Sequence, residues 1–139
     1  MKKSIATPSK TKEILKKNNL HLNKRLGQNF LIDTNIIKII IDAAQIHGDE
    51  VIIEIGPGIG SLTEYVLSEL DSGKLIAVEK DSRFIEILNG LLSSEKLTLI
   101  NEDVLNIDWH DLLSDIGEKK VKVIANLPYY ITTPVIMGL

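Results

Sequence analysis

Three glycines at alternate positions form the part of this sequence best suited to chemistry. The stretch reads Glu54-Ile55-Gly56-Pro57-Gly58-Ile59-Gly60 and follows the β-branched residues Val51 to Ile53. Such a run is typical of a buried parallel strand. Glycine adopts a positive φ and lets a ligand approach the main chain. Because residues 61–67 continue with helical spacing, we expect a strand, a tight turn and a helix N-terminus that bind part of a nucleotide-like cofactor.

The glycine spacing and its leading acid narrow the choice of cofactor. A dinucleotide fingerprint is G-x-G-x-x-G and holds phosphate on the helix N-terminus, whereas Ser61 stands here where the third glycine would fall. Glu54 lies in an apolar strand, and a buried carboxylate is costly unless it is paired or hydrogen-bonded. A cofactor with an ammonium and a sulfonium suits this acid better than NAD. The stretch resembles the first motif of class I S-adenosylmethionine (SAM) methyltransferases; a dinucleotide site and a purely structural turn remain the alternatives.

Acids also stand at the ends of the next two expected strands. Glu79 comes 23 residues after Gly56, where α/β nucleotide-binding folds place the carboxylate that binds ribose hydroxyls. Asp103 follows the third strand and can accept a hydrogen bond from an adenine amine. An ordinary strand-end acid is the structural alternative for Glu79.

The fourth strand leads into Asn126-Leu127-Pro128-Tyr129. An exocyclic amine of a nucleobase is a poor nucleophile, and two carbonyl acceptors, the Asn126 side chain and a main-chain carbonyl, would align it with a methyl donor. Pro128 stiffens the turn, and Tyr129 offers a face on which an extracted base can stack. A proline turn with core tyrosines is the structural alternative.

Alternating strands and helices must position these residues. The pattern predicts a Rossmann-like α/β fold whose parallel sheet has flanking helices and presents all four strand ends at one edge. Asp33 is the expected N-cap of the second helix, and residues 1–10 are expected to be disordered. Helices are expected at 11–19, 34–44, 61–70 and 82–92, and strands at 51–55, 74–79, 97–100 and 121–125.

Composition excludes several classes of function. The 139 residues contain no cysteine, and the three histidines have no metal-ligand spacing, so neither disulfides nor a metal site is expected. No apolar run approaches the roughly 20 residues of a membrane span, and no signal-peptide core follows the basic N-terminus. We therefore expect a cytoplasmic protein without a membrane partner.

Charge is distributed very unevenly along the chain. Residues 1–25 hold eight basic residues and one acid, whereas the remainder holds eight basic and eighteen acidic residues. A basic arm on an acidic body suggests a polyanionic partner, for which RNA or DNA is the usual choice, and a solvated terminus is the alternative.

The motifs together resemble the ribosomal RNA adenine dimethylases. Besides the glycine turn and the strand-end residues, the similarity includes Leu26-Gly27-Gln28-Asn29-Phe30-Leu31. The resemblance implies SAM-dependent dimethylation of the N6 amino groups of two adjacent adenosines near the 3′ end of 16S rRNA, in small-subunit biogenesis. It implies catalytic roles for Asn126, Leu127, Pro128 and Tyr129, and cofactor contacts from Gln28, Asn29, Leu31, Glu54, Gly56, Gly58, Gly60, Glu79, Asp103, Val104 and Asn126.

The resemblance also implies that Asn29 and Leu31 contact the methionine half of SAM and that Gly56 lies against it. The family continues beyond Leu139 into further strands and a small helical domain. We therefore expect residues 1–24 to be a basic arm and residues 25–139 to be the N-terminal part of the methyltransferase domain, truncated after the fourth strand. We expect this piece to have an exposed apolar sheet edge, to bind SAM weakly and to have little activity. The full-length form is expected to be a monomer.

Three other functions are compatible with parts of the pattern. The Erm enzymes, which methylate 23S rRNA and confer macrolide resistance, share these motifs, although the form Lys24-Arg25-Leu26-Gly27-Gln28-Asn29-Phe30 favours the 16S enzymes. A non-catalytic RNA-binding factor on the same fold has little reason to retain Asn126 to Tyr129. A dehydrogenase is disfavoured by Ser61 and by the absence of a plausible hydride-site histidine at the strand ends.

Overall fold

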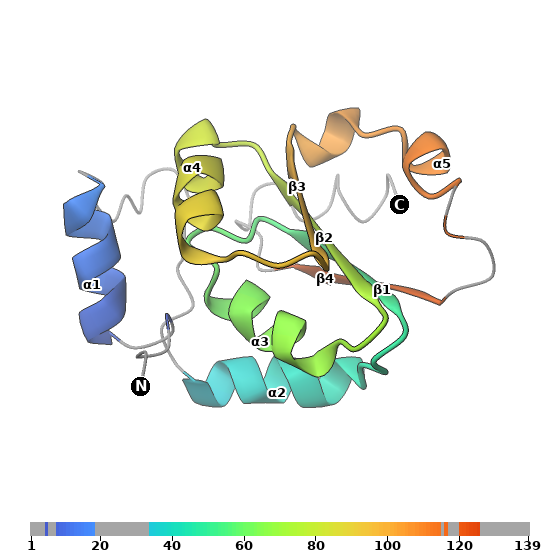
Figure 1. Ribbon diagram of the computed structural model, residues 1–139, viewed down its shortest axis with the longest axis horizontal. Coiled ribbons are helices and arrows are strands. Elements are labelled where there is room, and N and C mark those ends of the chain that lie inside the picture. The colour runs from blue at the N-terminus through green and yellow to red at the C-terminus, as the bar shows by residue number, and fades with distance from the viewer. Residues whose placement is uncertain (1–4, 6–7, 19–33, 115, 117–119, 126–139) are drawn as a thin grey trace.

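The computed structural model describes residue 5 and residues 8–18, 34–114, 116 and 120–125. Their core is a parallel sheet of four strands in the order β3-β2-β1-β4 (Figure 1). The strands are β1 (Val51–Ile55), β2 (Lys74–Glu79), β3 (Leu97–Asn101) and β4 (Val121–Ala125). This arrangement confirms the α/β fold predicted from the sequence.

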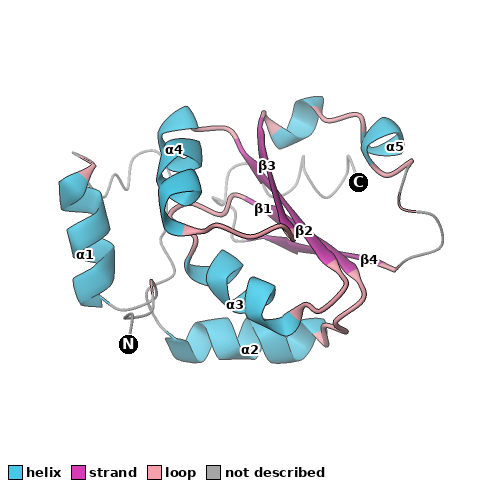
Figure 2. Ribbon diagram, viewed as in Figure 1, coloured by secondary structure: helices cyan, strands magenta, loops and turns pink. Residues whose placement is uncertain are grey.

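Helices connect the strands and cover the sheet (Figure 2). They are α1 (Pro8–Lys17), α2 (Thr34–Ala44), α3 (Ser61–Glu69), α4 (Ser82–Leu91), the short 3-10 helix η2 (Val104–Asn106) and α5 (Trp109–Leu112). The expected boundaries hold to within a few residues. The largest difference is at α1, which begins at Pro8 rather than Thr11, because proline is favoured in the first turn of a helix. The expected cap Asp33 lies outside the described residues.

Side chains alternate between two apolar layers, one on each face of the sheet. Ile52 and Leu75 pack against α2 and α3, where Ile37, Leu62 and Val66 are buried. The opposite layer contains every second residue of β1 and the neighbouring residues of β2, packed against the segment from η2 to α5: Val51, Ile53, Ile55, Ile76, Val78 and Val104, with Trp109 partly buried beside them. Trp109 therefore has a packing role.

Strand β4 forms one edge of the described sheet. Its pairing aligns Val121 with Val51 and Val123 with Ile53, so all four side chains point to the same face. Val121 and Val123 are 37% and 44% exposed, whereas their β1 partners are buried. The apolar side chains of Val121 and Val123 are therefore exposed to solvent on one face of this strand.

The expectation that residues 1–10 are disordered is wrong for those that the structure describes. Ser9 and Lys10 lie in α1, and Ile5 is only 3% exposed. The reason is an apolar face that the high charge of this segment obscures. Its buried residues pack against the glycine turn and α4 in one cluster: Ile5, Ile14 and Leu15 with Ile59, Phe84 and Ile87.

Candidate cofactor site

The turn between β1 and α3 has the backbone that its glycines predict. The φ angles of Gly56, Gly58 and Gly60 are 71°, 58° and 92°, a region of backbone conformation that residues other than glycine rarely adopt. The Gly56 N–H donates to the Val78 carbonyl at 3.0 Å, and the Gly60 N–H donates to the Pro57 carbonyl at 3.0 Å. These bonds fold the turn back over the carboxyl end of the sheet.

Glu79, the last residue of β2, is hydrogen-bonded to this turn. Its Oε1 accepts the Gly58 N–H at 3.2 Å, and its Oε2 accepts the Asp81 N–H at 2.9 Å. Burial raises the pKa of Glu79, while the N–H groups of Asp81 and Gly58 oppose that rise by stabilising the charged form. The strand-end acid and the first glycine motif, 23 residues apart, therefore meet as the sequence predicts.

Glu54 lies beneath the turn and is almost completely buried. Its Oε1 accepts a hydrogen bond from the Thr63 hydroxyl at 2.5 Å, and Thr63 itself is fully buried on α3. Burial raises the pKa of Glu54 to about 7, the Thr63 hydrogen bond lowers it, and the charge of Glu79 raises it further. Glu54 is thus hydrogen-bonded, as the cost of burying an acid in a strand requires.

The third strand contributes the predicted Asp103 and Val104 at the same edge. Asp103 caps η2, because its Oδ1 accepts the Leu105 N–H at 3.0 Å, and its Oδ2 lies 3.5 Å from the Lys80 ammonium. Val104 is buried in the second apolar layer. Asp103 is half-buried, so it remains reachable from solvent.

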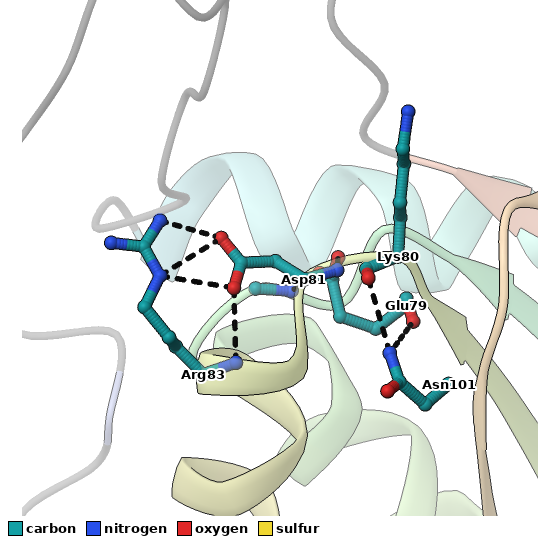
Figure 3. A network of polar contacts seen from close by, with 6 residues as sticks. Glu79, Lys80, Asp81, Arg83 and Asn101 are labelled. Carbon is teal, nitrogen blue, oxygen red and sulfur yellow. Dashed lines mark hydrogen bonds and ion pairs between the residues drawn. The ribbon is translucent and has the colours of Figure 1, made fainter.

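A network of polar contacts that sequence reasoning missed fixes the connection after β2 (Figure 3). The Asn101 side-chain amide donates to the Glu79 and Lys80 carbonyls at 3.0 and 3.1 Å, which ties the ends of β2 and β3 together. Asp81 caps α4 by accepting the Arg83 N–H at 2.9 Å, and it also pairs with the Arg83 guanidinium at 2.7 Å. These contacts hold the main chain whose Asp81 N–H binds Glu79.

Thr63 and Asn101 gave different signals in the sequence. Asn101 directly follows a predicted strand, so its place at the strand end could have been read from the same rule that selected Asp103. Thr63 lies in the first turn of a helix, and its partner Glu54 is nine residues earlier. A hydroxyl there is equally common as a surface or capping group, so no local pattern distinguishes it.

Seven of the predicted site residues lie outside the described residues: Gln28, Asn29, Leu31, Asn126, Leu127, Pro128 and Tyr129. The structure brings together the others, namely Glu54, the three glycines, Glu79, Asp103 and Val104, at the carboxyl edge of β1, β2 and β3. Across the described ranges, no group of three or more His, Asp or Glu side chains could hold a metal ion. None of the helices in these ranges has the length and apolar character needed to cross a membrane.

The site suits a ligand with hydroxyl groups and positive charge better than one with phosphates. Two carboxyl groups, Glu54 and Glu79, lie close enough to interact electrostatically, and either of them repels a phosphate placed beside it when it is ionised. The Ser61 hydroxyl, immediately after the turn, is buried and has no hydrogen-bond partner among the residues that the structure describes. A buried polar atom of this kind is available for a ligand.

Solved structures with this fold include a dimethyladenosine transferase and a 23S rRNA methyltransferase. A dimethyladenosine transferase from Plasmodium falciparum aligns with a TM-score of 0.60 and 28% identity, over 76% of this chain and 36% of that one. The 23S rRNA methyltransferase ErmE aligns with a TM-score of 0.63 and 24% identity, over 79% of this chain and 42% of that one, a likeness that shows the fold. The fold is therefore that of the Rossmann-like class I methyltransferases.

A family profile then identifies the group within that class. The profile described as "Ribosomal RNA adenine dimethylase" matches residues 19–139, so the chain belongs to the ribosomal RNA adenine dimethylase family. Two curated relatives carry the name "Ribosomal RNA small subunit methyltransferase A". The protein from Halothermothrix orenii is 51% identical over 100% of this chain and 46% of its own length. The one from Bacillus pumilus is 49% identical over 100% of this chain and 48% of its own. The chain spans about half the length of these relatives.

Proposed function

We propose that the whole protein dimethylates the N6 amino groups of two adjacent adenosines near the 3′ end of 16S rRNA, using SAM, during assembly of the small ribosomal subunit. Family membership and the names of the curated relatives support the rRNA substrate and the small subunit. The observation that carries the cofactor assignment is the Glu79 carboxylate hydrogen-bonded to the glycine turn at Gly58. An Erm-type activity on 23S rRNA has less support, because the likeness to ErmE is limited to the fold.

The described residues offer a consistent set of contacts for SAM. We assign the ribose hydroxyls to Glu79, which stands at the end of β2 with its oxygens on main-chain N–H groups. We assign the adenine to Asp103 and Val104, and the methionine half to the turn at Gly56, Gly58 and Gly60, above Glu54. From the family resemblance, Gln28, Asn29 and Leu31 complete the cofactor contacts.

We assign the binding of the reacting adenine amine to the residues that follow β4. Ala125, the last residue of β4, pairs with Ile55, the residue before the glycine turn. The sequence that continues from Ala125 is Asn126-Leu127-Pro128-Tyr129, which we propose as the catalytic segment. The Asn126 side-chain oxygen and a main-chain carbonyl would each accept an N–H of the adenine amine and so direct its lone pair, while Tyr129 stacks on the base. SAM supplies an electrophilic methyl group, so no strong general base is needed before transfer.

Several further assignments belong to this proposal. We infer that residues 25–139 form the N-terminal part of the methyltransferase domain and that residues 1–24 precede it as a basic arm. The whole protein would act as a monomer in the cytoplasm, where its ribosomal substrate is assembled. No metal takes part in the proposed reaction.

The cofactor assignment is tested by calorimetric titration of the chain with SAM, S-adenosylhomocysteine and NAD. We expect saturable binding of the first two, little binding of NAD, and a loss of at least tenfold in SAM affinity for Glu79→Ala, the scale of one lost charge-assisted hydrogen bond. Glu86→Ala, which removes an exposed acid of α4, is the control and should bind SAM like the wild type. NAD binding that exceeds SAM binding would contradict the assignment.

The substrate is tested separately with radiolabelled SAM. Methyl transfer to 30S subunits is compared with transfer to 50S subunits, using the full-length protein and the 139-residue chain side by side. We expect dimethyladenosine in 16S rRNA with the full-length protein and little turnover with the shorter chain. Transfer to 23S rRNA instead would establish the Erm-type activity.

A further inference from the structure

Helix α1 presents a face of exposed lysine side chains. Lys12, Lys16 and Lys17 are exposed, and Lys12 and Lys16 lie one turn apart on the same side of the helix. Lys10 differs from them, because it pairs with Glu13 at 3.6 Å. Among the described residues, none of the three exposed lysines forms an ion pair.

The opposite face of α1 packs against the glycine turn and α4. Ile14 and Leu15 are 4% and 6% exposed, and they share an apolar cluster with Ile59 of the glycine turn and Phe84 of α4. Figure 1 shows α1 lying beside α4. The lysines are therefore not on a loose tail but on a helix held next to the carboxyl edge of the sheet.

A favourable interaction with the helix dipole explains the positions of only some of these lysines. Lys16 and Lys17 lie in the last turn, where cations interact favourably with the helix dipole. Lys12 lies a turn earlier and gains little from that effect. Residues 1–25 carry eight basic residues and one acid, while the rest of the chain is acidic, so the basic face of α1 stands out as a local attraction for a polyanion.

We propose that the exposed face of α1 formed by Lys12, Lys16 and Lys17 is an RNA-contact surface that binds phosphates of the substrate RNA beside the glycine turn. This inference rests on the proposed function, which supplies the RNA, and adds the surface that holds it. Lysine ammonium groups interact with phosphates as point charges and do not read base edges here, so the proposed contact is independent of sequence and sensitive to salt. A membrane does not fit, because the apolar face that a surface-bound helix would insert is already buried by α4.

The experiment measures binding of a fluorescein-labelled RNA hairpin by anisotropy over a series of salt concentrations. The test variant is Lys12→Glu with Lys16→Glu, and the control is Lys38→Glu with Lys74→Glu, which changes the net charge equally at exposed sites of α2 and β2. We expect the slope of log affinity against log salt to fall by about 1.4 to 1.8 for the test variant, the release of counterions from two phosphates. The control slope should stay at the wild-type value.

A second pair of substitutions and a cofactor titration keep the outcomes distinct. Lys12→Gln with Lys16→Gln removes the charge without adding repulsion, and it replaces the glutamate variant if circular dichroism shows that the latter unfolds. An unchanged salt slope in a folded, SAM-binding variant would overturn the α1 surface and leave the proposed function standing. A wild type that fails to bind SAM would contradict the proposed function. Equal binding of poly-glutamate would overturn the choice of RNA as the partner.

Discussion

Replacing Glu54 with glutamine should remove a specific pH dependence from the stability of this protein. Glu54 is buried and its carboxyl oxygen accepts the Thr63 hydroxyl at 2.5 Å. Glutamine has nearly the same shape, and its amide oxygen can accept the same hydrogen bond. Glu54→Gln therefore deletes the titrating proton while preserving the packing around it.

The magnitude follows from the pKa of Glu54, which burial raises from its ordinary 4.5 to about 7. A carboxyl whose pKa is higher in the folded state stabilises the fold fully below its unfolded pKa, and this stability is lost as the pH rises through the folded pKa. Each pKa unit corresponds to about 1.4 kcal/mol. The free energy of unfolding should therefore lose roughly 3 kcal/mol from this group between pH 4.5 and about 7.

Urea denaturation of both proteins at several pH values measures this loss. Taking the difference between wild type and Glu54→Gln cancels the groups that titrate equally in both, and this difference should shift by roughly 3 kcal/mol in favour of the variant as the pH rises from 4.5 to about 7. Glu86→Gln, at an exposed acid of α4, is the matched control and should leave the pH profile unchanged. A difference that stays constant with pH for Glu54→Gln would show that this carboxyl is not held in its protonated form by burial.

Two further substitutions test the support of the turn. Thr63→Val removes the hydroxyl that lowers the pKa of Glu54. We expect urea denaturation to show a loss of about 1 to 3 kcal/mol in the free energy of unfolding, and this loss should be larger above pH 7. An equal loss at every pH would contradict the preference of this hydrogen bond for the charged carboxylate. Gly60→Ala places a methyl group at a φ of 92° and within 2.7 Å of a Leu88 methyl carbon, so a thermal melt should show at least about 1 kcal/mol of destabilisation. Gly90→Ala, where an added Cβ meets nothing within 4 Å, is its control and should stabilise α4 by roughly 0.5 to 1 kcal/mol; a stabilising Gly60→Ala would mean that the turn does not require glycine there.

Topology made the described half of the site predictable from the sequence. The β-branched residues of β1 and the spacing from Gly56 to Glu79 predict two neighbouring parallel strands, and parallel neighbours end at the same edge of a sheet. Glu79 and Asp103 therefore needed no knowledge of side-chain positions to be selected. The hydrogen bond from Gly58 to Glu79 is a direct consequence of that geometry.

Tertiary packing decided what the sequence did not predict. The pairing of Thr63 with Glu54 depends on how α3 rotates against β1, which no local pattern specifies. The burial of Ile5 was missed because the composition around it is strongly basic and suggests disorder. Three apolar residues within a charged segment suffice to anchor a helix when a neighbouring element offers a matching surface.

The position of Ile59 makes α1 and the glycine turn parts of one thermodynamic unit. Ile59 is 1% exposed, stands between Gly58 and Gly60, and packs in the same cluster as Ile14 and Leu15. A ligand that immobilises the turn must then also favour the docked form of α1. By reciprocity, whatever holds α1 in place must tighten the binding of that ligand by the same factor. Occupancy of the two surfaces is therefore expected to be cooperative, and this part of the coupling runs through the packing around Ile59 rather than through contacts between the two bound molecules.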